Sequence, residues 1–303
     1  MRCSFNFNKY LIGVLLFFYA QVPDCAAQSD STQTKLNAKR LRGFIIGESV
    51  GYVGTLAGLG SAWYGDKTSA FHFFDDNYEW LQIDKLGHLY TAYNLCRVSN
   101  QGFLWTGLSR KKSAVYGAVS GAAFMTTIEI LDGFQSEYGF SLGDMAANVV
   151  GPGLFLGQEL LWGETRIQPK WSFHHTSYAK LYPNKLGSSW NEEWLKDYNG
   201  QTYWFSANIY KFLPKGSKFP KWLNIAAGYG VENMVNADPV KSIAEGYAPY
   251  RQYYLALDVN LQHFKTKSRL LNTLIFILDQ IKIPAPTLEY NSKGGFIFHG
   301  LYF

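Results

Sequence analysis

The chain has 303 residues, a formal net charge of +5 and three cysteines, and 17% of its residues are aromatic. The charge is modest and its basic residues are scattered without a basic-aromatic motif, which argues against nucleic-acid binding. The abundance of Trp and Tyr is typical of proteins at a membrane interface, and equally of a well-packed aromatic β domain.

Residues 1–27 have the features of a secretory signal peptide. A basic start precedes the apolar run at 11–20, and Cys-Ala-Ala at 25–27 is a small-residue cleavage site. Asp24 departs from a lipobox, so we do not expect lipidation of Cys25. The alternative is an uncleaved anchor helix. Cleavage leaves Cys96 as the last cysteine, which excludes an intrachain disulfide and predicts a small core residue there.

Residues 28–165 are predicted to form a helical domain. Residues 41–63 are apolar and rich in glycines at four-residue spacing, which lets helix backbones approach closely. This segment is long enough to span a bilayer, and it could equally be a buried helix in a bundle. A loop dense in aromatics and acids follows at 65–80. Three more helices are predicted at about 84–101, 112–132 and 141–162.

Polar residues stand three or four positions apart on each of these three helices, and therefore on one face of each. They are Asp84, Lys85 and His88 on the first, Glu129 and Asp132 on the second, and Asp144 and Asn148 on the third. Faces turned inward would bury ionisable groups, which is costly unless they pair, bind metal or share protons. Ser141 is a natural N-cap, with Asp144 at the capping-box position, which is a purely structural explanation for Asp144.

Two chemical hypotheses follow from this polar cluster. His88 and the carboxylates could hold a divalent metal such as zinc, manganese or iron, although no HExxH motif is present. His88 could instead act as general acid and base, with Glu129, Asp132 and Asp144 orienting it or binding metal. Such a site would act on an envelope lipid or glycan, but no nucleophile motif such as GxSxG accompanies it.

The structural hypothesis explains the same residues without chemistry. Asp84 and Lys85 would cap and solvate a helix start, and Asn148 would hydrogen-bond across a glycine-lined interface. In a functional site the same three residues would be the candidate binding residues. Networks of this kind fix the register of packed helices when every member has a partner. Because no nucleophile is marked, we favour this explanation.

Residues 166–303 are predicted to be β-rich. Strict alternation indicates a strand at 251–263, with further strands at 202–212, 223–231 and 296–303. An amphipathic helix is predicted at about 268–281, followed by an extended connector at 282–286. The terminal Phe303 after alternating apolar residues resembles the closing strand of an outer-membrane barrel. Only four or five good strands are recognisable, so an antiparallel sheet packed on the helices is favoured over a small barrel.

The motif series DKLGH, then ExxD, then GxSxxDxxxNxxG resembles the uncharacterised YfiM-like family of periplasmic lipoproteins, and more distantly VanZ-like membrane proteins. The resemblance covers roughly residues 80–157. The positions on the family pattern are Asp84, Lys85, His88, Glu129, Asp132, Ser141, Asp144, Asn148 and Gly151. It implies an envelope location and a small helical unit, and no established activity. This chain departs from the family by lacking a lipobox and by its long β-rich half.

The expected fold class is α+β, with a glycine-rich bundle of three to four helices followed by an antiparallel β-rich region. The expected function is that of an exported cell-envelope protein of structural or assembly type at the periplasmic face of the outer membrane. Its expected partners are the membrane or other envelope proteins. The alternatives are an envelope lipid- or glycan-directed enzyme and an inner-membrane protein whose helices are spans. The substrate and the oligomeric state are not specified.

Overall fold

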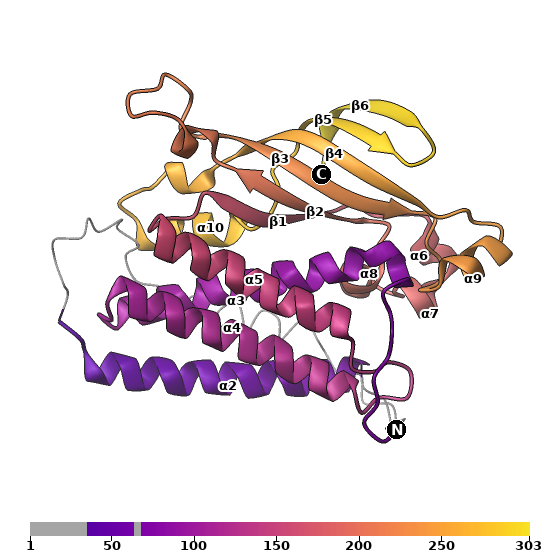
Figure 1. The fold of residues 1–303 in the computed structure, drawn as a ribbon, viewed down its shortest axis with the longest axis horizontal. Helices are drawn as coiled ribbons and strands as arrows, with labels where there is room; N and C mark the ends of the chain where they lie inside the picture. Colours follow the sequence, from indigo (N-terminus) through magenta and orange to yellow (C-terminus); the bar gives the residue numbers. More distant parts are fainter. Residues whose placement is uncertain (1–34, 64–67) are drawn as a thin grey trace. The chain divides into compact units, whose positions relative to one another are not determined.

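Figure 1 shows the computed structural model, which describes residues 35–63 and 68–303. The predicted signal peptide at 1–27 lies outside the described residues. The chain divides into two compact units. The helical unit holds the described residues up to Asp75, Thr91–Gly163 and Lys267–Thr273, and the sheet unit holds Asp76–Tyr90, Glu164–Thr266 and Leu274–Phe303.

Three to four helices were predicted in the first half of the chain, and its described residues form four long ones. They are α2 (Ala38–Trp63), α3 (Ile83–Trp105), α4 (Arg110–Asp132) and α5 (Leu142–Leu161). The apolar spacing of these segments therefore located each helix to within a few residues at most ends. Helix α3 starts in the sheet unit, and its residues from Thr91 onward belong to the helical unit.

The core of the helical unit is built from small and aromatic side chains. One buried cluster contains Tyr93 and Cys96 of α3, Ala114 and Ala118 of α4, and Phe155 of α5. The prediction that Cys96 is a core residue is confirmed, because its side chain is fully buried. Burial raises the pKa of the Cys96 thiol to about 12, so the thiol stays protonated and is a poor nucleophile.

Close helix approach occurs at glycines of α4, outside the glycine-rich segment that suggested it. A Cβ atom at Gly117 would lie 2.8 Å from the backbone nitrogen of Asn100 and 2.8 Å from the carbonyl oxygen of Cys96. A Cβ at Gly121 would lie 2.6 Å from the Cys96 sulfur. By contrast, Cβ atoms at three glycines of α2 would meet nothing within 4 Å: Gly43, Gly54 and Gly58. At these three positions the close approach that the spacing permits does not occur.

Helix α4 is the helix in the described part of the chain that is long and apolar enough to cross a membrane, by length and composition. Several of its side chains are buried, including Ala114, Ala118 and Phe124. A buried core helix meets the same criterion as a membrane span. The alternative of an inner-membrane protein with several spans stays a prediction.

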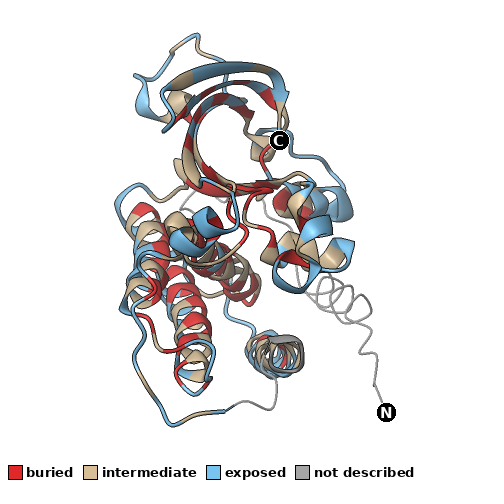
Figure 2. Cartoon of the chain, turned by 90° about the vertical axis from the view of Figure 1, so that its right-hand side faces the viewer, coloured by how far each residue is buried: buried red, intermediate tan, exposed pale blue. Residues whose placement is uncertain are grey.

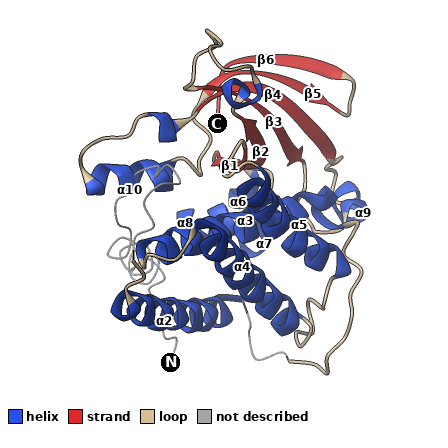
Figure 3. Ribbon diagram, turned by 60° about the vertical axis from the view of Figure 1, so that its left-hand side comes forward, coloured by secondary structure: helices blue, strands red, loops and turns tan. Residues whose placement is uncertain are grey.

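The second half of the chain forms one antiparallel sheet in which each strand pairs with the next along the chain (Figure 3). Its strands are β1 (Ile167–Phe173), β2 (Gln201–Ala207), β3 (Leu223–Glu232), β4 (Tyr250–Val259), β5 (Ala285–Asn291) and β6 (Gly295–Tyr302). The predicted α+β class is confirmed. Strands β1 and β5 were not predicted, and β5 begins inside the predicted connector at 282–286.

A short helix precedes α3, and the others interrupt the connections of the sheet. They are η1 (Glu79–Gln82), α6 (Tyr178–Leu181), α7 (Pro183–Leu186), α8 (Trp190–Lys196), η2 (Ile209–Phe212), α9 (Pro239–Ala244), η3 (Leu261–His263) and α10 (Arg269–Leu278). Helix α10 lies within its predicted range. The turns η2 and η3 shorten two predicted strands, because the chain leaves the sheet after Ala207 and after Val259.

The sheet is open. Within the described residues β1 and β6 are its two edges and do not pair with each other. The small barrel considered as an alternative is therefore wrong. Beside β1, a single parallel bridge joins Trp171 to Ile281.

The sheet curls, and its outer side is exposed (Figure 2). Along β4 the buried positions include Gln252, Tyr254 and Asp258, whereas Leu255 and Leu257 are exposed. Strand β5 repeats this pattern, with polar positions buried and apolar ones exposed. The alternation of residue types with a period of two therefore predicted these strands correctly. The face that is buried in β4 and β5 is the one with the polar side chains.

Candidate functional site

The DKLGH motif begins directly after a strained turn. Trp80, Leu81 and Gln82 have φ values of 46°, 49° and 66°, in the left-handed region that costs about 1–3 kcal/mol for each non-glycine residue. The Tyr229 hydroxyl donates a hydrogen bond of 2.5 Å to the carbonyl oxygen of Leu81. Arg251 donates to the same oxygen at 3.1 Å and to Gln82 Oε1 at 3.0 Å. Side chains from β3 and β4 therefore hold the turn that sets the start of α3.

The lysine of the motif neutralises two buried carboxylates. Lys85 Nζ lies 2.6 Å from Asp76 Oδ2 and 3.0 Å from Asp84 Oδ2. Burial raises the pKa of the Asp84 carboxyl, and the charge of Lys85 opposes that rise. Burial and the nearby charges of Asp76 and Asp84 likewise raise the pKa of Glu79. The Lys85 ammonium is therefore the cation that compensates the charge of both carboxylates.

The glycine and the histidine of the motif have separate surroundings. A Cβ at Gly87 would lie 2.9 Å from the hydroxyl oxygen of Tyr203, so the helix packs closely on β2 at this point. His88 is half-buried, one turn after Asp84, and its charge lowers the pKa of the Asp84 carboxyl. The acid–base and metal-binding roles considered for His88 stay predictions.

In the helical unit, Glu129 completes the cap of helix α5. The Ser141 hydroxyl oxygen accepts a hydrogen bond of 3.1 Å from the backbone nitrogen of Asp144, which confirms the predicted N-cap. Glu129 Oε1 of α4 accepts a hydrogen bond of 2.5 Å from the backbone nitrogen of Ser141. In a capping box this second bond comes from the residue three positions after the cap, here Asp144. The buried Glu129 supplies it from another helix.

Asn148 links the same two helices further along. Its Nδ2 donates a hydrogen bond of 3.4 Å to the carbonyl oxygen of Met125. Glu129, Asp144 and Asn148 are all buried in the helical unit, whereas Asp132, the last residue of α4, is half-buried. The hydrogen bonds of Glu129 and Asn148 join α4 to α5, in keeping with the structural hypothesis, whereas the catalytic role of Glu129, Asp132 and Asp144 stays a prediction.

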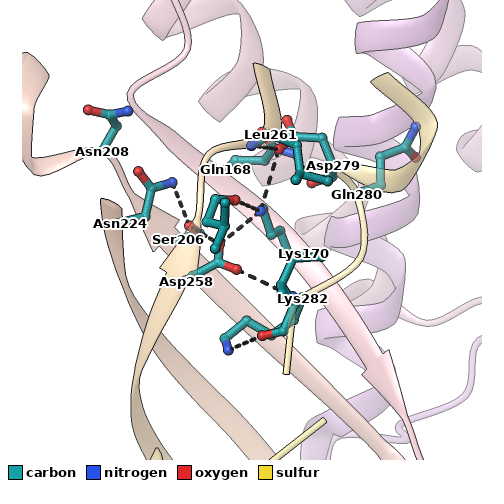
Figure 4. A network of polar contacts seen from close by, with 12 residues as sticks. Gln168, Lys170, Ser206, Asn208, Asn224, Asp258, Leu261, Asp279, Gln280 and Lys282 are labelled. Carbon is teal, nitrogen blue, oxygen red and sulfur yellow. Dashed lines mark hydrogen bonds and ion pairs between the residues drawn. The ribbon is translucent and has the colours of Figure 1, made fainter. Parts of the chain in front are cut away.

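A second buried polar network lies on the inner face of the sheet, and the sequence did not reveal it (Figure 4). Lys170 of β1 is only 1% exposed, and its Nζ lies 2.8 Å from Asp258 Oδ2 and 3.5 Å from Asp279 Oδ1. Asp258 also accepts a hydrogen bond of 2.6 Å from the Ser206 hydroxyl. Ser206 in turn accepts one of 2.9 Å from Asn224 Nδ2. The alternation in β4 was visible in the sequence, but β1 was not predicted and Lys170 had no assigned partner.

Lys282 is the second buried lysine of this network. Its Nζ donates a hydrogen bond of 2.8 Å to the carbonyl oxygen of Ile283 and lies 4.9 Å from the ring centroid of Trp204. Burial lowers its pKa to about 8, against the opposing influence of Asp258. A lowered pKa means that folding disfavours the charged form of this lysine.

We expect Lys282→Met to stabilise the protein at about pH 7, by about 1–3 kcal/mol. In the wild type, the free-energy cost of burying charged Lys282 is fully present below about pH 8. This cost is lost as the pH rises toward the ordinary pKa of lysine, because between the two pKa values the unfolded chain binds more protons than the folded one. Urea unfolding at about pH 7 and about pH 9.5 measures this, and the advantage of the variant should shrink at the higher pH. The exposed Lys241 provides the control, since Lys241→Met should change neither value. A less stable variant at both pH values would contradict this account of Lys282.

The inner face also carries a histidine–carboxylate pair. His299 Nε2 of β6 lies 2.8 Å from Glu289 Oε2 of β5. The Tyr302 hydroxyl donates a hydrogen bond of 2.7 Å to the Tyr254 hydroxyl oxygen, and the two rings stack with centroids 4.6 Å apart. The inner face is therefore lined by polar and aromatic groups that bond to one another.

Comparison with known proteins bears on the helical segment. Residues 72–156 match the family model described as predicted periplasmic lipoprotein (DUF2279). The matched range contains DKLGH, Glu129 and the α5 cap, and the match supports an exported protein of the periplasm and cell envelope. No curated protein and no solved structure matches the chain.

Proposed function

We propose that this is an exported structural or assembly protein of the cell envelope, associated with the periplasmic face of the outer membrane. The observation that carries the proposal is the polarity of the sheet, which buries charged and polar side chains and exposes apolar ones along β4 and β5. Membrane proteins of the outer membrane distribute polarity in the same sense, apolar outward and polar inward. The match to a family of predicted periplasmic lipoproteins supports the compartment.

The contacts of the motif residues support a role without catalysis. Glu129 caps helix α5, Asn148 joins α5 to α4, and Lys85 pairs with two carboxylates. Each of these contacts satisfies a buried group that would otherwise be costly, and so each stabilises the unit in which it lies. On this proposal the motif series marks a helical scaffold.

Density fractionation of the envelope with a tagged copy, followed by a carbonate wash, tests the location. We expect the protein in the outer-membrane fraction, resistant to washing. Recovery in the inner-membrane fraction would overturn the outer-membrane assignment and would favour the alternative in which helices are spans.

The tagged protein also tests the structural role of Glu129, by means of the variant Glu129→Ala. We expect a lower abundance of the variant, because the Ser141 nitrogen loses its acceptor at a cost of about 1–3 kcal/mol. Glu137→Ala, at an exposed acidic residue of the same unit, is the matched control and should keep normal abundance. Immunoblotting measures both. Normal abundance of the Glu129 variant with complete loss of the cellular phenotype would contradict the structural role and favour the enzyme alternative.

A further inference from the structure

The outer face of strands β3 to β6 carries a continuous set of exposed apolar side chains, which we call the outer apolar face. Its members are Ile225, Leu255, Leu257, Leu288, Phe296 and Phe298. The strand register places Ile225 opposite Leu257, and it aligns Leu255 with Leu288 and Leu288 with Phe298. Leu255 is 56% exposed and Phe298 is 72% exposed. Exposed apolar patches of this continuity mark contact surfaces.

An aromatic row borders this face toward one end of the strands. Tyr253, Tyr290 and Phe296 are exposed and are aligned by the strand register across β4, β5 and β6. The neighbouring ring centroids are 6.4 and 5.0 Å apart. Tyrosines with an apolar ring and a polar tip are favoured where a protein meets the headgroup region of a membrane.

A basic rim borders the face at the opposite end of β3 and β4. It consists of exposed lysines from two connections: Lys215, Lys218, Lys221 and Lys265. Neither 209–222 nor 260–266 contains an acidic residue. The two connections are adjacent, because Leu223 pairs with Val259 and the nitrogen of Asn260 donates to the Trp222 carbonyl oxygen at 2.8 Å. Trp222 and Phe264 are exposed within the rim.

The outer apolar face is long enough for extended contact with a membrane surface. Tyr253 and Val259 are six residues apart on β4, which is roughly 20 Å at about 3.3 Å per residue. The sheet here is open, and an unpaired strand edge is excluded from the hydrocarbon core. Contact with one surface of a bilayer therefore fits better than crossing it.

We propose that the outer apolar face and the basic rim together bind the surface of an anionic lipid bilayer. The apolar side chains contact acyl chains, and the rim lysines meet lipid phosphates. Charge complementarity argues for this occupant, since exposed lysines in segments that contain no acidic residue attract anionic headgroups. The cellular setting of this contact rests on the proposed function, whereas the lipid binding itself follows from the surface.

Co-sedimentation of the purified chain with vesicles tests the proposal. Two vesicle types are compared: phosphatidylcholine alone, and equal amounts of phosphatidylcholine and phosphatidylglycerol. We expect binding to the mixed vesicles that weakens with added salt, and much less binding to phosphatidylcholine alone. Equal binding to both types, or binding to neither, would overturn the proposal.

Paired variants separate the two parts of the surface. Lys215→Glu with Lys218→Glu should weaken binding to mixed vesicles at least about tenfold. Leu288→Ser with Phe298→Ser should weaken it to a similar degree, at least about tenfold, because acyl contacts are lost. Lys241→Glu is the matched control, since this exposed lysine lies on α9 and follows the other end of β3. Circular dichroism melting checks that each variant folds like the wild type.

Three outcomes decide between occupants and between proposals. Unchanged vesicle binding in both paired variants would overturn the lipid surface. Loss of self-association in the Leu288/Phe298 variant, with vesicle binding intact, would overturn it in favour of a contact between copies of this chain. Vesicle binding that responds to the variants supports the lipid surface even if fractionation places the protein away from the outer membrane, a result that would overturn only the proposed function.

Discussion

Asp258→Ala is expected to destabilise the protein by about 3–5 kcal/mol. Asp258 is fully buried, lies 2.8 Å from Lys170 Nζ and accepts a hydrogen bond from Ser206. Its loss leaves Lys170 with the more distant Asp279 and leaves Lys282 without the favourable influence of a carboxylate. Removing one partner of a buried pair is costly because the remaining charge stays buried without compensation. Urea unfolding followed by circular dichroism measures the loss.

A double variant tests whether the cost comes from the unpaired charge. Lys170→Met combined with Asp258→Leu removes both charges of this pair and replaces them with apolar groups of similar size. We expect the double variant to be more stable than Asp258→Ala, because apolar replacement of a whole buried pair is often neutral or stabilising. A change of less than about 1 kcal/mol in the single variant would show that this pair does not hold the sheet unit together.

Gly117→Val is expected to destabilise the helical unit by about 3 kcal/mol or more, the upper range for overpacking. An added Cβ would lie 2.8 Å from two backbone atoms of α3, those of Asn100 and Cys96. Backbone atoms cannot move aside by a rotamer change, so α3 and α4 would have to separate and lose the packing around Cys96. Thermal melting followed by circular dichroism at 222 nm, roughly the helix minimum, reports the change.

Gly153→Ala on α5 is the matched control, since a Cβ there meets nothing within 4 Å. Replacing a helical glycine by alanine in open space should leave stability unchanged or raise it by about 0.5–1 kcal/mol. Equal effects of the substitutions at Gly117 and Gly153 would mean that α4 does not depend on close approach at Gly117.

The helices were predictable because their apolar spacing is local information. The predicted segments at 84–101, 112–132 and 141–162 correspond to α3, α4 and α5. In α2 the glycine spacing did not lead to close approach at Gly43, Gly54 and Gly58, because four-residue spacing permits such contact but does not bring another helix to each position. In α4, Gly117 and Gly121 do meet α3, and that contact depends on residues distant in sequence.

The strands were predictable where alternation was strict, as in β3 and β4. Strand β1 was not predicted from the sequence because Ile167–Phe173 contains Pro169 and polar residues, a composition that lowers strand propensity. Pairing with β2 along its whole length compensates for that composition. Tertiary contacts thus override local preference in this segment.

Among the candidate residues, contacts between near neighbours in sequence were predictable and contacts between distant segments were not. The role of Ser141 as an N-cap was predicted because a cap involves neighbours three residues apart. The bond from the Ser141 nitrogen to Glu129 joins residues twelve positions apart through a turn, and local patterning has no rule for it. The Lys170 network joins β1, β4 and the segment after α10, and it arises only when these segments meet.

By itself the sequence determined that a helical segment is followed by strands whose two faces differ in polarity, because both follow from apolar periods of 3.6 and 2. Which face of the sheet is buried was decided by the tertiary structure. Curling of the sheet brings Lys170, Asp258 and Asp279 together, so that buried charges compensate one another. The apolar residues of the alternation, including Leu255 and Leu257, then lie outside. Period alone cannot specify this choice, since polar groups can be buried at acceptable cost only where distant partners meet them.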